Sequence, residues 1–278
     1  MTNAATPAIQ PNSFHLGLSS EWLVNAVSDN IRSLLEVEPE LALGQPITTL
    51  LSNDVIHEIR NRMALLRSED AIEHLFQFNL GGSERSYDLA LYRCGSGFGI
   101  DVEPCEERSA GDSTGILSGM LSRVKTSDDI GQLCDQACGQ LRALTGFQQV
   151  SISTGQVQLG QSMRTGGELI SPSASIESDM VVFDRDADPV AIHVIDKNWS
   201  SLLMTLPSPS LAEVDRLRKM PARAALVVPL HRDGQVWGQV ACYHGSPRHV
   251  SAQRRNIARL FANIMSLRIE IAELRRGS

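Results

Sequence analysis

The stretch ARAALVVPLHRDGQVWGQVACYH, residues 222–244, decides the fold of the second half of the chain. Its two apolar runs, 223–231 and 235–243, are joined by Asp233-Gly234. Asp-Gly between two such runs favours a two-residue turn with positive φ angles, which connects antiparallel strands. The stretch therefore predicts a β-hairpin within an antiparallel sheet.

Patterns on either side of this hairpin predict the rest of a second domain. Apolar residues recur three and four positions apart in two stretches before it, and Gly146 follows the second stretch. This spacing is typical of amphipathic helices, and glycine is a common stop signal. The predicted elements are helices over 114–124, 130–145, 208–220 and 251–275, and strands over 148–153, near 181, over 190–195 and in the hairpin.

The first half of the chain predicts a smaller domain of its own. Short apolar strands alternate with brief helices, and turn signals such as Gly81-Gly82-Ser83 stand between them. The predicted strands are 22–27, 73–80, 86–93 and 97–103, with helices at 30–35 and from Asn53 onward. An antiparallel meander with small helices on one side is an α+β arrangement.

Composition and charge exclude several classes of function. The chain of 278 residues carries 25 basic and 32 acidic side chains, a net charge of −7. Nucleic-acid binding needs a concentrated basic surface, and a membrane span needs an apolar run of about 20 residues. The sequence has neither, and no secretory signal is visible in residues 1–11. Because five cysteines suit a reduced compartment, we expect a cytoplasmic protein without nucleic-acid or membrane partners.

Several motifs resemble the PAS and GAF domains of bacterial phytochromes. They are Leu144-Thr145-Gly146-Phe147, LRKMPARA at 217–224, the hairpin with Ser246-Pro247 after it, Ile9-Gln10-Pro11, and Tyr92-Arg93 with GIDVEP at 99–104. The resemblance covers nearly the whole chain. It implies an α+β fold in which a PAS domain precedes a GAF domain, each an antiparallel sheet with helices. It also implies that the N-terminal segment threads a GAF loop as a figure-eight knot.

Four regions are expected from this resemblance and from the polar segment between the domains. They are an N-terminal knot-threading segment (1–20), a PAS domain (21–105), a linker (106–113) and a GAF domain with a long terminal helix (114–278). In the family such a pair feeds a PHY domain and a histidine kinase or another output, for which this chain has no room. We therefore expect a regulatory module of a two-component or other signal-transduction system, with no catalytic residues, acting on a downstream domain or partner protein.

Phytochromes sense red light through a bilin, and this sequence departs from the family at the positions that bind it. The family's thioether cysteine lies before the IQP motif, whereas the first cysteine here is Cys94. The altered pocket positions are Ser175 for an aspartate, Glu213 for a histidine, Val227 and Pro229 for two serines, and Tyr243 for a histidine, with His244 beside it. Arg223 is the one nearby cation that could still meet a carboxylate. We expect no cofactor and no response to light.

Two other uses of the GAF pocket stay open. The remodelled pocket could belong to a small-molecule or redox receptor, with Arg223 and His244 as the residues to test. Alternatively, the chain is a protein-interaction scaffold whose pocket is filled by side chains. Cys134 and Cys138 lie one helical turn apart without further metal ligands nearby, so we expect buried, inert thiols and no metal site.

The terminal helix carries an apolar seam with alternating spacings of three and four. Its members are Ile257, Leu260, Ile264, Leu267, Ile271 and Leu274. Such a seam is typical of a coiled coil and favours a homodimer through this helix and the helices of 114–145. The alternative is an ordinary amphipathic helix that packs on its own sheet. Phe261 and Met265, beside the seam, are expected to pack on the domain itself.

Overall fold

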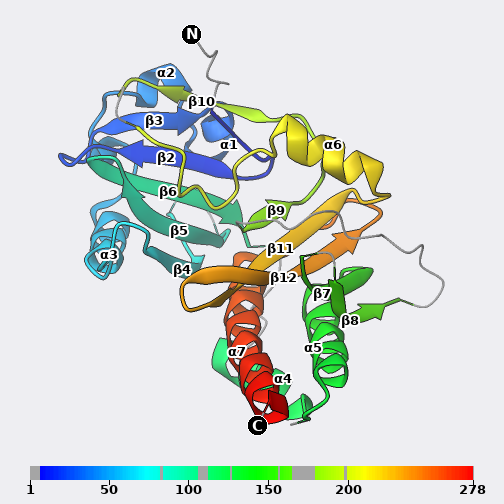
Figure 1. Ribbon diagram of the computed structural model, residues 1–278. Coiled ribbons are helices and arrows are strands. Elements are labelled where there is room, and N and C mark those ends of the chain that lie inside the picture. The colour runs from blue at the N-terminus through cyan, green and yellow to red at the C-terminus, as the bar shows by residue number, and fades with distance from the viewer. Residues whose placement is uncertain are drawn as a thin grey trace. The chain divides into compact units, whose positions relative to one another are not determined.

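The computed structural model describes residues 7–81, 84–105, 112–125, 127–155, 157–164, 179–196 and 199–277. The chain divides into two compact units, which Figure 1 shows with their helices and strands labelled. The first unit comprises Met1–Arg108 together with Ala187–Ser208. The second unit comprises Ser109–Asp186 and Pro209–Ser278.

The first unit is built on a seven-stranded antiparallel sheet with the strand order β1-β10-β3-β2-β6-β5-β4. The strands are β1 (Ala8–Ile9), β10 (Val190–Val194), β3 (Val24–Ser28), β2 (Phe14–Leu18), β6 (Gly97–Pro104), β5 (Tyr87–Cys94) and β4 (Ile72–Phe78). The meander β4-β5-β6 confirms the three strands predicted in this region. β10 comes from far along the chain, yet it lies between β1 and β3.

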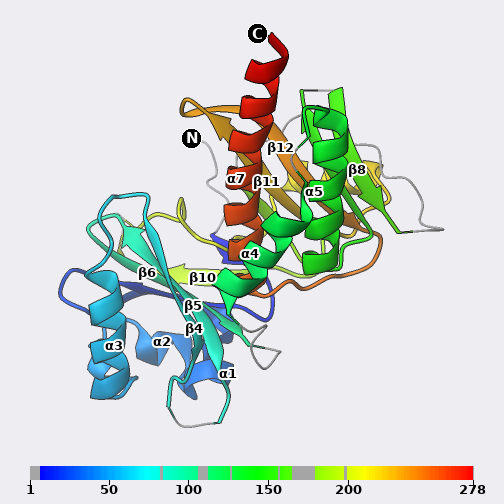
Figure 2. The same cartoon turned by 90° about the horizontal axis from the view of Figure 1, so that it is seen from below.

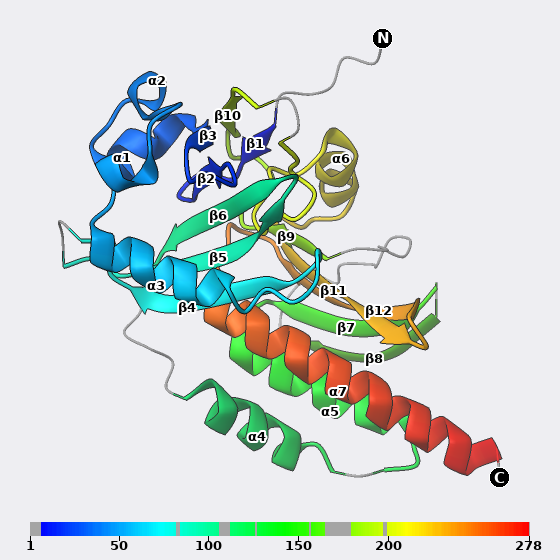
Figure 3. The same ribbon diagram turned by 90° about the vertical axis from the view of Figure 1, so that its left-hand side faces the viewer.

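Helices cover one side of this sheet. The small ones are η1 (Asp29–Ile31), α1 (Arg32–Leu35), α2 (Pro39–Ala42) and η2 (Ile47–Thr49). The longest, α3 (Asn53–Met63), lies across β4 and β5 in Figure 3. Its N-cap is Ser52, whose hydroxyl accepts a hydrogen bond from the Val55 N–H. The apolar residues at helical spacing on α3 are buried against the sheet, as their pattern predicts.

The compact units differ from the predicted regions in two places. Residues 14–18, expected in a separate N-terminal segment, form β2 in the middle of the first sheet. Residues 187–208, expected in the GAF domain, belong to the first unit because β10 completes its backbone hydrogen bonds with β1 and β3. Residues 106–111 of the predicted linker lie outside the described residues. The figure-eight knot stays a prediction.

The second unit contains a five-stranded antiparallel sheet with the order β8-β7-β12-β11-β9. The strands are β8 (Val157–Met163), β7 (Gln149–Thr154), β12 (Gln235–His244), β11 (Ala224–Arg232) and β9 (Met180–Val182). The β11–β12 hairpin confirms the first prediction, with φ angles of 50° at Asp233 and 74° at Gly234. The edge strand β8 was not predicted, because it is mostly polar and only partly buried.

Helices lie on both faces of this second sheet, as Figures 1 and 2 show. They are α4 (Ser113–Arg123), α5 (Ile130–Thr145), α6 (Leu211–Lys219) and α7 (Ala252–Gly277). α5 begins at its N-cap Asp129 and ends at Gly146 in the left-handed conformation, as predicted. α5 and α7 pack together on one face, and α6 lies on the other. No helix among the described residues is long and apolar enough to cross a membrane.

Candidate functional site

The sheet face beneath α6 holds the positions that the resemblance relates to bilin binding. Val227 pairs with Ala241 and Ala225 pairs with Tyr243, so these side chains share one face of the sheet. They belong to an apolar cluster that also includes residues of β9 and the end of α6. Its buried members are Met180, Val182, Leu217, Met220, Ala222, Ala225, Val227, Ala241 and Tyr243.

Two altered pocket residues, Val227 and Tyr243, are completely buried in this cluster, with 0% exposure each. Burial raises the pKa of Tyr243 to about 12, which Arg216 only partly offsets. The phenol is therefore neutral at physiological pH. Its hydroxyl has no hydrogen-bond partner among the described residues. Pro229 is buried two positions along β11, where it pairs with Gln239.

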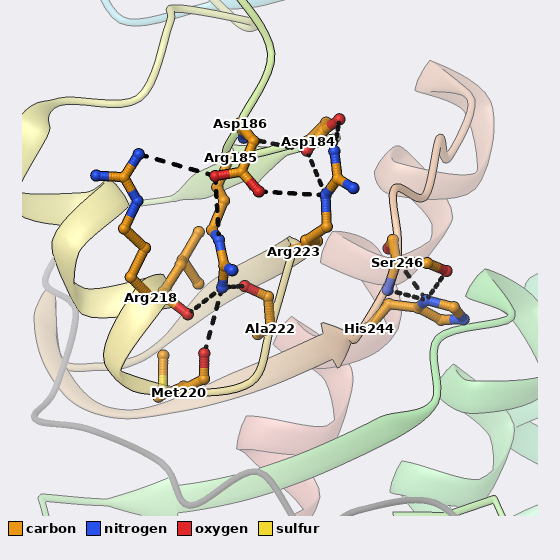
Figure 4. Close-up of polar contacts among 10 residues, drawn as sticks. Asp184, Arg185, Asp186, Arg218, Met220, Ala222, Arg223, His244 and Ser246 are labelled. Carbon is orange, nitrogen blue, oxygen red and sulfur yellow. Dashed lines mark hydrogen bonds and ion pairs between the residues drawn. The ribbon is translucent and has the colours of Figure 1, made fainter.

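Arg223, the cation expected to be available for a carboxylate, is held by two aspartates, as Figure 4 shows. Its Nε donates to Asp184 Oδ1 at 2.9 Å and its terminal nitrogen to Asp184 Oδ2 at 2.6 Å. Asp186 lies 3.4 Å from the same guanidinium. Hydrogen bonding to Asp184 raises the pKa of Arg223, so its guanidinium stays charged at physiological pH. A fork of this kind is the stronger form of ion pair.

Arg185, between these aspartates in sequence, has its Nε 3.5 Å from Asp186 Oδ1, and its terminal nitrogen reaches α6. Its guanidinium donates to the carbonyl oxygens of Leu217, Met220 and Ala222, which closes the C-terminal end of α6 (Figure 4). Orphan carbonyls at a helix end need such donors. Residues 184–186 were missed in the sequence analysis, although a triplet of alternating charge beside an apolar strand is a visible signal for ion pairing.

Glu213 and His244 serve local structure. Glu213 Oε2 accepts a hydrogen bond from the Ser210 N–H at 2.7 Å, and the Ser210 hydroxyl accepts one from the Glu213 N–H, which makes a capping box. His244 ends β12, where its Nδ1 meets the Ser246 N–H at 3.2 Å and the Ser246 hydroxyl at 3.0 Å. The Ser-x-x-Glu spacing could have revealed the capping role. Ser175 lies outside the described residues.

The cysteine side chains are mostly buried. Burial raises the pKa of Cys134 and of Cys242 to about 12, and it raises that of Cys138 as well. Thiols of this kind stay protonated and react slowly. Cys94, on β5, is also buried, with 6% exposure. The described residues contain no group of three side chains suited to a metal ion.

The seam of α7 divides into a buried and an outward part. Ile257 is buried within the unit, and so are Phe261 and Met265, as expected for the last two. The other seam residues face outward or are half-buried. Their exposed fractions are 45% for Leu260, 59% for Leu267, 49% for Ile271 and 69% for Leu274, with Ile264 intermediate.

Two family models match the chain. One described as a GAF domain matches residues 129–269, more than half of the chain, and one described as a PAS fold matches residues 5–105. The chain therefore belongs to the GAF domain family and carries a PAS fold ahead of its GAF domain. Within that class it resembles the PAS–GAF modules of phytochromes, which confirms the resemblance seen in its motifs.

Named relatives agree with this assignment. Phytochrome E of Ipomoea nil is 24% identical over 226 residues, which is 67% of this chain and 20% of that protein. The photosensory core module of Stigmatella aurantiaca phytochrome has a TM-score of 0.81 at 20% identity, covering 96% of this chain and 58% of that one. The chromophore-binding domain of RpBphP3 from R. palustris has a TM-score of 0.78 at 20% identity, covering 97% and 96%. The chain thus spans about a fifth of the plant relative.

Proposed function

We propose that this chain is a light-insensitive phytochrome-like regulatory module that does not bind bilin. The observation that supports this most is the packing of Val227 and Tyr243, which are fully buried in one apolar cluster. At these positions the resemblance implies polar ligands for the bilin. A bilin carries two propionate carboxylates, and a carboxylate that leaves water without a charged or hydrogen-bonding partner is strongly disfavoured.

Arg223 supports the same proposal. A propionate that approached this guanidinium would compete with Asp184, which already makes two hydrogen bonds to it. Displacing Asp184 would leave a second carboxylate, with 21% exposure of its side chain, without its cation. Because both side chains are partly exposed, water would offset part of this loss, and the pair disfavours a ligand carboxylate only modestly. Asp184 therefore takes the place on Arg223 that a carboxylate of a ligand would need.

Addition of biliverdin to the purified chain tests this proposal. We expect the visible spectrum of the mixture to equal the sum of free biliverdin and protein, with no pigment retained after gel filtration. The chromophore-binding domain of the Stigmatella aurantiaca phytochrome, treated identically, is the positive control. A red-absorbing band that co-elutes with this chain would refute the proposal.

A second candidate function, a protein-interaction module, is favoured by the outward seam of α7. Four large apolar residues on one helical stripe are at least 45% exposed in the single chain. We infer that this stripe pairs with its counterpart in a second copy, and that the dimer acts on a downstream signalling domain or partner in the cytoplasm. The module itself is proposed to be non-enzymatic. A small-molecule or redox receptor is less favoured, because Arg223 is engaged by Asp184 and the pKa values of the core thiols are raised.

A further inference from the structure

A buried polar cluster surrounds Asp101 on β6, within the first unit. Asp101 is 2% exposed, and each of its carboxylate oxygens meets two polar groups. Oδ1 accepts a hydrogen bond from the Tyr92 hydroxyl at 3.0 Å and lies 2.8 Å from His15 Nδ1. Oδ2 accepts from the backbone N–H of Thr205 at 2.6 Å and from the Thr205 hydroxyl at 2.9 Å. All four acceptor positions of the carboxylate are therefore used.

The cluster joins two parts of the chain that are far apart in sequence. His15 lies on β2 and Tyr92 on β5, the two strands that flank β6, whereas Thr205 belongs to the segment Ala187–Ser208. Burial raises the pKa of Tyr92 well above its usual value, with the Asp101 charge as a further cause, so this phenol remains a donor. Trp199, from the same segment as Thr205, packs its ring edge-to-face with His15 at 5.3 Å.

Two contacts with carboxylates, His193 with Asp29 and Asp196 with Asn25, lie earlier in the segment, whereas the other contacts around Thr205 are between neutral groups. The Cys94 thiol donates to the Ser200 carbonyl oxygen at 2.8 Å, and the Gln10 N–H donates to the Leu206 carbonyl oxygen at 3.0 Å. The Ser208 hydroxyl donates to the Ile9 carbonyl oxygen at 2.9 Å. Hydrogen bonds to an ionised group are roughly twice as strong as neutral ones, and burial from water strengthens them. The two bonds from Thr205 to Asp101 therefore dominate at this end of the segment.

We propose that Asp101 is a positioning residue that clamps the segment Ala187–Ser208 onto the PAS sheet. Asp101 acts on the C-terminal part of the segment, around Thr205, whereas residues 190–194 are held by the pairing of β10 with β1 and β3. This device does not depend on whether the module binds bilin.

Hydrogen exchange of the full chain, measured by mass spectrometry, tests the clamp with the variant Asp101→Asn. Asparagine keeps one acceptor oxygen but removes the negative charge, so the hydrogen bonds that Thr205 and Tyr92 donate to Asp101 lose their charge-assisted strength. We expect peptides within 187–208 to exchange at least tenfold faster than in the unsubstituted protein.

Asp88→Asn is the matched control. Asp88 is equally buried in the same sheet, at 3% exposure, but its Oδ1 accepts from the Gln77 N–H on β4. This variant should speed exchange in β4 and leave residues 187–208 unchanged. Thr205→Val removes one of the two bonds to Asp101 and should give an intermediate effect in 187–208.

Three results would overturn or decide the proposed clamp. Equal exchange patterns for the Asp101 and Asp88 variants would overturn the clamp, as would unchanged exchange in 187–208. If Asp101→Asn fails to fold, Thr205→Val decides, because an unchanged rate within 187–208 in that variant overturns the proposal.

Discussion

Replacing Leu267 with aspartate should weaken the proposed dimer without unfolding the monomer. Leu267 is 59% exposed on α7, in the middle of the outward seam. Complete burial of a leucine side chain contributes about 1.5–3 kcal/mol, so covering its exposed part contributes roughly 1–1.8 kcal/mol. A twofold dimer contains the contact twice, which gives about 2–3.5 kcal/mol. Since 1.4 kcal/mol is tenfold in affinity, the dissociation constant of the dimer should rise by at least about 30-fold.

Sedimentation velocity over a range of protein concentrations measures this change directly. The matched control is Leu41→Asp, because Leu41 is 66% exposed on α2 of the first unit and lies outside the seam. Thermal unfolding of both variants should stay close to that of the unsubstituted chain. The reasoning fails if the unsubstituted chain is monomeric throughout, or if Leu41→Asp shifts the equilibrium as much as Leu267→Asp does.

Three further substitutions test the packing and protonation within the units. Folding raises the pKa of Tyr243 to about 12. As the pH rises above the usual tyrosine pKa, the unfolded chain therefore loses this proton before the folded chain does. Stability should therefore fall between about pH 10 and 12, and Tyr243→Phe should flatten this slope in pH-dependent urea unfolding; an unchanged slope contradicts the assignment. Gly139→Ala should raise stability by about 0.5–1 kcal/mol, because helical Gly139 has nothing within 4 Å of an added Cβ. Gly17→Ala should lower stability by about 1–3 kcal/mol, because its Cβ would lie 2.8 Å from Asn25 Oδ1 and Trp199 Nε1; calorimetry that ranks the two variants the other way would contradict this packing.

Local signals in the sequence were enough for most individual elements. The Asp233-Gly234 turn and its flanking apolar runs predicted the β11–β12 hairpin, and the helical spacing over 130–145 with Gly146 after it predicted the bounds of α5. Each signal lies within a few residues of the element it specifies. The phytochrome-like motifs then predicted the order of the two domains, which the family models confirm.

The candidate site could be predicted only in part. Sequence comparison located Val227, Tyr243 and Arg223 correctly on and beside the hairpin, but it could not show what faces them. Asp184 reaches Arg223 across 39 positions of sequence, and no local pattern specifies that approach. Glu213 was interpreted as a pocket position, whereas the Ser210 capping box uses its carboxylate. Partners depend on distance in space, which spacing along the chain does not encode.

By itself, then, the sequence determined the helices, the hairpin, the phytochrome-like PAS–GAF pairing and the loss of the family's polar residues. These depend on side-chain type and on periodicities of two and 3.6 residues, which act over short stretches. Only the tertiary structure decided that residues 187–208 complete the PAS sheet and that Asp101 fastens them there. An unpaired strand edge can accept any strand with free backbone groups, so its partner is chosen by the folded chain rather than by local sequence.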